Sequence, residues 1–178
     1  MGLISFLSSR LSGPKRIKSV AGSIYDFKIN DLAGNQIDFN RYKGKALLIV
    51  NTASKCAFTP QYAALETLHE KYGDNVAVLG FPANNFMWQE PLADQEIASF
   101  CQKNYGVNFQ MFGKISVKGN NQHPLYKWLT AKTGKVPSWN FCKYFVSKDG
   151  KEIKFYPSKT HPLESDIVNE IINSASSH

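Results

Sequence analysis

The sequence predicts an α/β protein with a mixed central sheet flanked by helices and an added β-hairpin near its N-terminus. Two continuous apolar runs, at 46–50 and 76–81, support this prediction, because strands that are covered on both faces lack the polar alternation of half-exposed strands. Apolar side chains at helical spacing separate the two runs, which is the order of a strand–helix–strand unit. The 178 residues fit one compact domain with a short appendage.

The first half of the chain predicts the hairpin and then this strand–helix–strand unit. Residues 24–29 and 37–39 flank a turn at 32–35, a pattern typical of two antiparallel strands. After the first buried run, a helix is predicted to begin near Pro60 and to end at Tyr72. Cys56 therefore falls at the carboxyl end of the first buried strand, just before the helix.

The second half predicts three more helices and a final pair of strands. A loop at 82–91 follows the second buried strand and is too rich in Pro and Asn to continue it. Helices are predicted at 94–104, 124–133 and 163–172, and strands at 141–146 and 153–156. This order of elements is most simply a thioredoxin-like arrangement with an added hairpin.

Basic residues near the N-terminus supply most of the net charge of +7. Four of them, and no acidic residue, precede Asp26: Arg10, Lys15, Arg16 and Lys18. Removing these four charges from +7 leaves +3, so a nucleic-acid-binding surface is the weaker interpretation. We expect a basic leader at 1–22 and one domain at 23–178. An organelle transit peptide, a short surface helix and a disordered segment all stay open for the leader.

No apolar run approaches the roughly 18 residues of a membrane-spanning helix, which excludes a transmembrane protein. Cys56, Cys101 and Cys142 are widely separated, with no CxxC pair and no zinc-type spacing, so we expect neither a metal nor a cofactor. An odd cysteine count indicates a reducing compartment, here the cytoplasm or an organelle addressed by the leader. The histidines show no ligand or triad spacing and are interpreted as surface or capping residues: His69, His123, His161 and His178.

Cys56 has the placement of a reactive thiol. The N-terminus of a helix offers unpaired amide donors and a partial positive charge, which together with the adjacent Lys55 favour the thiolate. A thiolate attacks a peroxide, takes up one oxygen and becomes a sulfenic acid. A lone cysteine is more often a small buried hydrophobe, so the placement alone leaves both interpretations open.

Three segments, taken together, resemble motifs of the glutathione peroxidase family. In the order of that family they are 51–62 with Cys56, 79–86 followed by Gln89-Glu90-Pro91, and Trp139-Asn140-Phe141. The likeness extends from about Ile24 to Ile172. The resemblance implies a thioredoxin-like fold and a thiol peroxidase that reduces hydrogen peroxide and organic or lipid hydroperoxides.

The resemblance also implies a catalytic set. Cys56 would be the peroxidatic nucleophile, and Gln89, Trp139 and Asn140 would be neutral donors that stabilise the thiolate and steer a proton to the departing oxygen. Cys101 matches the resolving cysteine of the thioredoxin-dependent branch, where it would form a disulfide with Cys56 that thioredoxin reopens. Cys101 falls in the helix predicted at 94–104, whereas the Cα atoms of a disulfide must lie within about 7 Å of each other. We therefore expect the reduced protein to hold these two thiols too far apart, so that a disulfide requires local unwinding of the helix.

The chain departs from the family pattern at several positions. Ala57 stands where glycine is common, Ala83 replaces a frequent cysteine, and Asn85 replaces a common glutamine. Met87-Trp88 occupies a site that usually holds small residues, where an apolar pair could shape the peroxide entrance or offer a docking surface. Cys142 is not part of the pattern, and we interpret it as a structural or incidental thiol.

Three questions of function stay open. The long insertion of tetrameric family members is absent between residues 129 and 139, which predicts a monomer or weak dimer with an open site that suits a macromolecular reductant. Glutathione is the alternative reductant, with a mixed disulfide at Cys56 and Cys101 as a bystander. A peroxide sensor that relays oxidation to a partner protein is the third interpretation, and the preferred hydroperoxide is undetermined.

Overall fold

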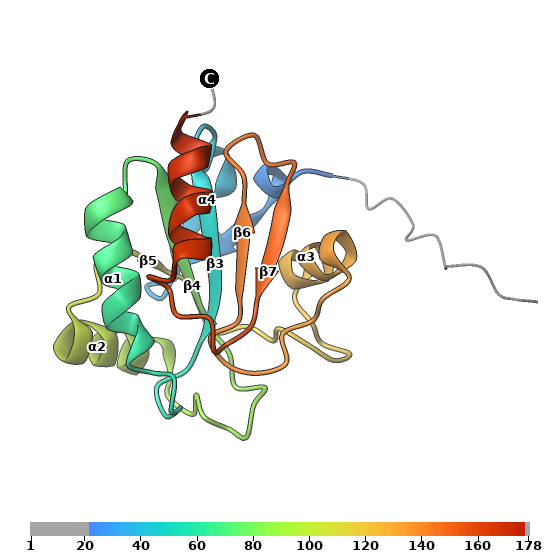
Figure 1. The fold of residues 1–178 in the computed structure, drawn as a ribbon. Helices are drawn as coiled ribbons and strands as arrows, with labels where there is room; N and C mark the ends of the chain where they lie inside the picture. The colour runs from blue at the N-terminus through green and yellow to red at the C-terminus, as the bar shows by residue number, and fades with distance from the viewer. Residues whose placement is uncertain (1–21, 177–178) are drawn as a thin grey trace, which may run out of the picture.

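The computed structural model describes residues 22–176, so the predicted leader lies outside the described residues except for Gly22. A five-stranded mixed sheet with the order β5-β4-β3-β6-β7 forms the centre of this part (Figure 1). Its strands are β3 (Ala46–Thr52), β4 (Val76–Pro82), β5 (Gln110–Met111), β6 (Lys143–Val146) and β7 (Ile153–Tyr156). β3, β4 and β5 run parallel, β6 pairs antiparallel with β3, and β7 pairs antiparallel with β6.

The central strand β3 is buried on both faces of the sheet. Leu47 and Ile49 belong to one apolar cluster, whereas Ala46, Leu48 and Val50 belong to the other. Because successive side chains point to opposite faces, a strand between two cores must be apolar at every position. This requirement accounts for the continuous apolar run in the sequence.

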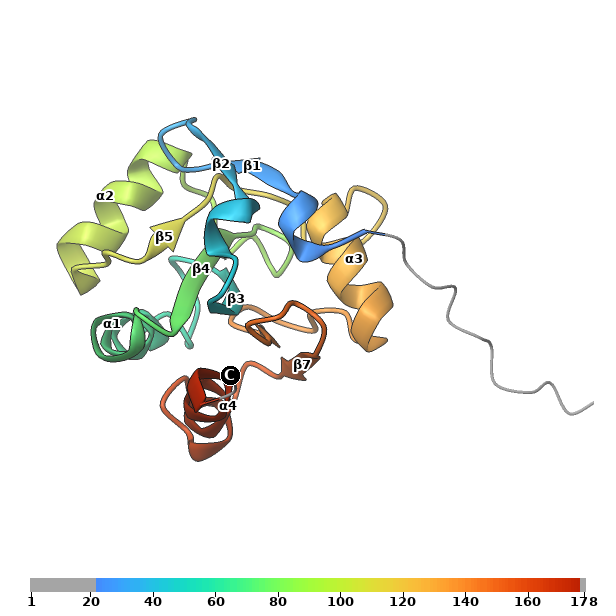
Figure 2. The same ribbon diagram turned by 90° about the horizontal axis from the view of Figure 1, so that it is seen from above.

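Four α-helices cover the sheet within the described residues: α1 (Gln61–Tyr72), α2 (Asp94–Tyr105), α3 (Pro124–Thr133) and α4 (Ser165–Ser176). Figure 2 shows α1 and α4 on one side of the sheet, α3 on the other, and α2 near the β5 edge. α1 buries Tyr62, Leu65 and Leu68, as the helical spacing predicts. The prediction of helices on both faces is therefore confirmed.

The predicted hairpin is present as β1 (Lys28–Asn30) and β2 (Gln36–Asp38), outside the main sheet. It is flanked by two 3₁₀ turns, η1 (Ile24–Asp26) and η2 (Phe39–Tyr42). The strand-like run that was predicted to begin at residue 24 therefore begins with a turn. Its cause is a capping box, in which Ser23 Oγ accepts the Tyr25 N–H and the Asp26 carboxylate accepts the Ser23 N–H.

Among the other elements, β6, α4 and β5 differ from the sequence prediction. β6 begins at Lys143 rather than at residue 141, because Phe141 has a φ of 62°, which is incompatible with an extended strand. α4 begins at Ser165 rather than at residue 163, after a turn in which Glu164 Oε1 accepts the His161 N–H. β5 was not predicted from the sequence, because two residues are too few to show an alternating pattern.

Candidate active site

The candidate site lies beyond the carboxyl ends of β3 and β4, where three segments meet. The loop after β3 carries Cys56, the loop after β4 carries Gln89, and the segment before β6 carries Trp139 and Asn140. Figure 1 shows both loops at the lower end of the sheet. In open α/β sheets, this end is the usual place for a ligand.

Hydrogen bonds within its own loop fix the position of Cys56. Its N–H donates to Thr59 Oγ1 at 3.0 Å, and that hydroxyl donates to the carbonyl of Ala53 at 2.8 Å. The Phe58 N–H donates to Cys56 Sγ at 3.4 Å. Because Cys56 is 9% exposed, the thiol lies at the edge of the core, held by a backbone donor just before α1 begins.

Two hydrogen bonds join the Cys56 loop to the Gln89 loop. The Lys55 N–H donates to the backbone carbonyl of Gln89 at 2.9 Å. Ser54 Oγ donates to Glu90 Oε1 at 2.7 Å. Together they fasten Gln89 beside the residue that precedes Cys56, although the two loops are more than 30 positions apart in the sequence.

The segment that contains Trp139 is fastened to the end of β3 through Asn51. Asn51 Nδ2 donates to the carbonyl of Trp139 at 2.9 Å, and the Phe141 N–H donates to the carbonyl of Asn51 at 2.6 Å. The Trp139 ring packs against Phe86, with 5.7 Å between the ring centroids. Trp139 also packs against the apolar cluster that contains Cys56.

A side-chain pair links this segment to the Gln89 loop. Asn140 Nδ2 donates to Gln89 Oε1 at 2.8 Å, which fixes the orientation of the Gln89 amide. Within residues 22–176, no protein acceptor takes a hydrogen bond from Gln89 Nε2. Asn140 Oδ1 is buried and also without a hydrogen-bond partner there. The fold therefore leaves an uncharged donor and an uncharged acceptor unused at the place where the three segments meet.

Cys101 lies on α2, in the same apolar cluster as Cys56. It is 2% exposed and, like Cys56 and Cys142, a free thiol. The pKa of the Cys101 thiol is raised to about 11, because burial and the Glu90 charge raise it more than the Tyr62 hydroxyl lowers it. At neutral pH the Cys101 sulfur is therefore a thiol, which is a poor nucleophile.

Glu90 is a further residue of this site, and its sequence pattern did not predict it. Its side chain is fully buried, Oε1 accepts the Ser54 hydroxyl, and Oε2 has no partner within the described residues. Burial raises its pKa, against the Ser54 hydrogen bond and the charge of Lys114. Its charge also acts on Cys101 and Tyr62, so Glu90 couples the two thiol regions. The sequence feature that could have indicated Glu90 is its position between Gln89 and Pro91.

Cys142 and its neighbour Lys143 are both fully buried. Cys142 Sγ lies 3.4 Å from Ser158 Oγ. Lys143 Nζ donates to Gln61 Oε1 at 2.6 Å and to the carbonyls of Ser158 at 3.2 Å and Thr160 at 2.5 Å. Burial lowers the pKa of Lys143 to about 8. This amine joins the first turn of α1 to the chain that leads into α4.

Two histidines are capping residues, as the sequence predicts. His123 Nδ1 accepts the Leu125 N–H at the start of α3, and His161 Nδ1 accepts the Leu163 N–H. His178 lies outside the described residues. Across residues 22–176, the structure contains no group of three or more His, Cys, Asp or Glu side chains that could hold a metal ion, and no helix long and apolar enough to cross a membrane.

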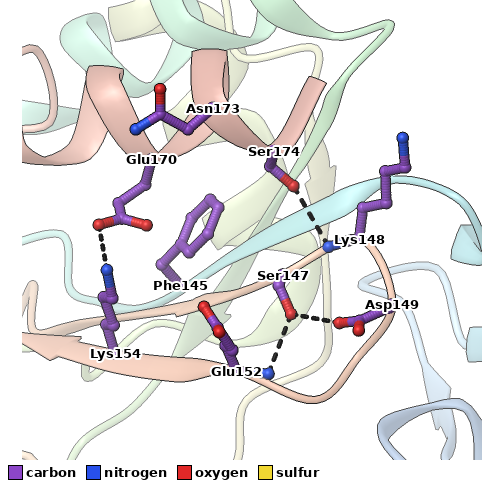
Figure 3. Close-up of a pocket in the computed structure, with 9 residues that line it drawn as sticks. All are labelled: Phe145, Ser147, Lys148, Asp149, Glu152, Lys154, Glu170, Asn173 and Ser174. Atoms are coloured by element: carbon purple, nitrogen blue, oxygen red, sulfur yellow. Dashed lines mark hydrogen bonds and ion pairs between the residues drawn. The ribbon is translucent and has the colours of Figure 1, made fainter. Parts of the chain in front are cut away.

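A hollow of about 370 Å³ lies away from the candidate site, between the β6–β7 hairpin and α4 (Figure 3). The Lys154–Glu170 ion pair and a hydrogen bond from Ser147 to Asp149 lie along it. β6 is antiparallel to β3 and places Val146 opposite Leu47, so the hollow lies toward the amino end of β3. The hollow therefore lies at the end of the sheet opposite Cys56. The side chains of its ion pair and of its hydrogen bond are already paired with each other.

Related proteins align with most of this chain. A family model described as glutathione peroxidase matches residues 24–130. The glutathione peroxidase-like peroxiredoxin gpx1 of Schizosaccharomyces pombe is 48% identical over 150 residues, which cover 80% of this chain and 95% of the relative. The hydroperoxy fatty acid reductase gpx1 of Synechocystis is 45% identical over 153 residues, which cover 80% of this chain and 90% of the relative.

Solved structures confirm the predicted fold class. The crystal structure of Trgpx in its apo form matches with a TM-score of 0.71 and 39% identity, covering 89% of this chain and 98% of Trgpx. A putative thioredoxin from Neisseria meningitidis matches with a TM-score of 0.55 and 16% identity, covering 86% of this chain and 91% of that chain. At that identity the second match shows the fold alone, and this fold is thioredoxin-like.

Proposed function

The chain belongs to the glutathione peroxidase family, whose members reduce hydroperoxides, and we propose that Cys56 is the nucleophile with which it does so. One observation carries the proposal: Cys56 is held just before α1, in a loop hydrogen-bonded to a second loop that presents a free amide donor, Gln89 Nε2. We further propose that residues 23–178 are the peroxidase domain, acting as a monomer or weak dimer.

In the first step, Cys56 Sγ attacks the terminal oxygen of a hydroperoxide. A sulfur–oxygen bond forms and the oxygen–oxygen bond breaks, so the sulfur is oxidised to a sulfenic acid while the peroxide is reduced. The proton lost by the thiol passes to the departing oxygen, which leaves as an alcohol or as water. The lining of the site must therefore stabilise negative charge first on sulfur and then on the leaving oxygen.

Gln89, Trp139 and Asn140 suit this requirement because they are uncharged. An amide or indole N–H stabilises an anion without forming an ion pair that would hold the thiolate back. Asn140 occupies the Gln89 carbonyl oxygen with its own amide, and thereby keeps Gln89 Nε2 available as a donor. In this proposal Asn140 is a positioning residue for Gln89, and Gln89 with Trp139 supplies the donors.

In the second step, Cys101 resolves the oxidised enzyme. Its sulfur attacks the sulfenic acid at Cys56, a disulfide forms, and the hydroxyl leaves as water with the proton of the Cys101 thiol. Thioredoxin then transfers two electrons by thiol–disulfide exchange, which restores both thiols. Since Cys101 is buried on α2 with a raised pKa, local opening of α2 must precede its attack.

Glutathione is a second candidate reductant, and the burial of Cys101 favours it. If α2 does not open, the sulfenic acid at the edge of the core stays available to a small thiol. Glutathione would then form a mixed disulfide at Cys56, and a second glutathione would release the enzyme. For the oxidant, the name of the Synechocystis relative supports hydroperoxy fatty acids among the substrates of this chain.

Peptide mapping under non-reducing conditions, after one equivalent of peroxide, separates the two reductants. We expect a linked peptide pair containing Cys56 and Cys101, and NADPH oxidation supported by thioredoxin. The Cys142→Ser variant is the matched control, because it removes a buried thiol that takes no part in the proposal. If the Cys56 peptide is joined only to glutathione, and the Cys101→Ser variant keeps full turnover on glutathione, then glutathione and not thioredoxin is the reductant.

A further inference from the structure

Met87 and Trp88 are the most exposed large apolar residues between residues 22 and 176. They are 73% and 79% exposed, whereas the other exposed ones reach only 40–46%: Val136, Leu163 and Ile172. The pair directly precedes Gln89 and forms no part of the core clusters. Apolar side chains this exposed, next to the candidate site, are typical of a surface that binds another apolar body.

The backbone at this pair is unusual as well. Met87 and Trp88 have φ values of 51° and 52°, in the left-handed region that favours glycine. The Gln89 N–H donates to the carbonyl of Phe86 at 3.2 Å, so the pair occupies the two central positions of a four-residue turn. Turns with two positive φ values usually contain Gly or Asn at these positions. Two bulky residues at positions that favour glycine indicate that the side chains themselves are needed.

The turn forms the tip of a projecting loop. Figure 1 shows the green segment between β4 and α2 extending furthest at the lower end of the molecule. Phe86 and Glu90, on either side of the tip, are buried at 2% and 0% exposure. The loop is thus anchored by its flanks, and only the tip with its two apolar side chains reaches outward.

Three lysines surround this tip. Lys118 Nζ lies 4.3 Å from the centre of the Phe86 ring. Lys114 is exposed, and its Nζ donates to the carbonyl of Glu90 at 3.3 Å. Lys55 is also exposed, and its N–H is bonded to the last residue of the turn. The carboxyl group of Glu90 is buried below the tip and is not part of its exposed surface.

We propose that Met87 and Trp88, with Lys55, Lys114 and Lys118, form a tip that docks the enzyme on an anionic lipid surface. A Trp ring suits the boundary between headgroups and acyl chains, a flexible Met side chain fits among the chains, and lysines attract anionic headgroups. A protein partner would need about 800 Å² of surface on this side, whereas two projecting side chains are enough for shallow insertion.

The consequence for activity rests on the proposed function. A docked tip places Gln89 and Cys56 at the lipid surface, because Gln89 follows the pair directly and the Lys55–Gln89 hydrogen bond ties Cys56 to it. Hydroperoxides on lipid chains would then reach the thiol without leaving the membrane. Hydrogen peroxide, which arrives through water, gains nothing from docking.

The test compares the full chain with the double variant Met87→Gly/Trp88→Gly. Glycine accepts the positive φ of both positions, so this variant removes the side chains and keeps the turn, which its thermal unfolding curve verifies. Co-sedimentation uses vesicles of phosphatidylcholine with and without phosphatidylserine. We expect the variant to bind the mixed vesicles at least about tenfold more weakly than the full chain does. Lys118→Gln should weaken binding by a smaller factor, and salt should do the same.

Ile172→Ser is the matched control, because Ile172 is an exposed apolar residue on α4 that should not affect vesicle binding. Every protein in the series carries the same basic N-terminal residues, so their contribution cancels. Equal binding by the full chain and the double variant would overturn the proposal. So would unchanged vesicle binding together with a raised KM for thioredoxin, which would make the tip a protein-docking surface.

Failure of this proposal and failure of the proposed function give different results. Vesicle binding is measured without peroxide and does not depend on Cys56 chemistry. Hydrogen peroxide turnover in solution should be the same in the double variant and in the full chain. If the full chain shows no Cys56-dependent turnover, the proposed function fails, whatever the vesicles show.

Discussion

The loop that holds Cys56 and the helix that holds Cys101 contribute thiols to the same apolar cluster, but they surround these thiols with different partners. Cys56 lies at the edge of the core and accepts a backbone N–H from Phe58. Cys101 lies deeper, near the Tyr62 hydroxyl and the Glu90 carboxyl group, and its pKa is raised. The two thiols therefore differ in burial and in the groups around them, and this difference is the basis for expecting Cys56 to react first.

Glu90 belongs to both regions. Through Ser54 it is hydrogen-bonded to the Cys56 loop, and through its charge it acts on the Cys101 thiol. A negative charge near Cys101 disfavours its thiolate and so raises its pKa. Movement of the Gln89 loop would therefore change the environments of both thiols together.

Removing the Cys56 sulfur should have the largest effect on activity. Cys56→Ser should lower peroxide reduction by about 10³-fold or more, because no other thiol is held by donors at the edge of the core. Stopped-flow measurement of peroxide consumption gives the rate constant, with Cys142→Ser as the control that keeps it. Substantial turnover in Cys56→Ser would show that Cys101, and not Cys56, is the thiol that attacks the peroxide.

Cys101→Ser should separate the two roles. The first equivalent of peroxide should be reduced at the normal rate, because Cys56 and its donors are unchanged, whereas turnover supported by thioredoxin should stop. Single-turnover kinetics and the NADPH-coupled assay measure the two quantities on the same sample. Full thioredoxin-supported turnover in this variant would remove Cys101 from the mechanism.

The donors around Cys56 should account for a smaller share of the rate. Gln89→Leu and Trp139→Phe should each lower the rate constant of the first step by about 10²-fold, as the loss of one preorganised donor commonly does. Gln95→Leu, at an exposed position of α2, is the matched control for the first variant. Unchanged rate constants in both donor variants would show that the backbone around Cys56 suffices for catalysis.

The smallest expected effect is on stability at alkaline pH. Cys101 has a pKa of about 11 in the folded chain, against an ordinary value of 9.0. Stability from this thiol is therefore present below pH 9 and is lost as the pH rises through about 11, because the unfolded chain loses its proton first. Two pKa units correspond to about 2–3 kcal/mol.

Urea unfolding across this pH range measures the effect. The free energy of unfolding should fall by about 2–3 kcal/mol more in the wild type than in Cys101→Ser. Lys143, whose pKa burial lowers to about 8, makes stability rise with pH over part of this range, but it does so in both proteins and cancels in the difference. Parallel curves for the two proteins would show that Cys101 is less buried than the structure places it.

The sequence predicted the parts of the fold that depend on periodic patterns. The apolar runs of β3 and β4 and the helical spacing of α1 are local signals, and each element formed as predicted. η1 was missed because its Ser23–Asp26 capping box overrides a strand-like composition. The early end of the strand before Phe141 was missed because no pattern of residue types indicates a positive φ at a phenylalanine.

The candidate site was less predictable than the fold. Motif resemblance predicted Cys56, Gln89, Trp139 and Asn140 as candidates, and the structure brings the segments that carry them together. The role of Glu90 could not be read from the sequence, because it depends on tertiary contacts with Ser54 and the α2 thiol. Burial and charge coupling of this kind exist only after the chain has folded.

Trapping the first oxidised sulfur shows whether Cys56 is the nucleophile. The Cys101→Ser variant is treated with one equivalent of hydroperoxide in the presence of dimedone, which adds to sulfenic acids, and the adduct is located by mass spectrometry. We predict a single adduct on Cys56, formed as fast as the peroxide disappears. An adduct on Cys142, or peroxide consumption that leaves Cys56 unmodified, would contradict it.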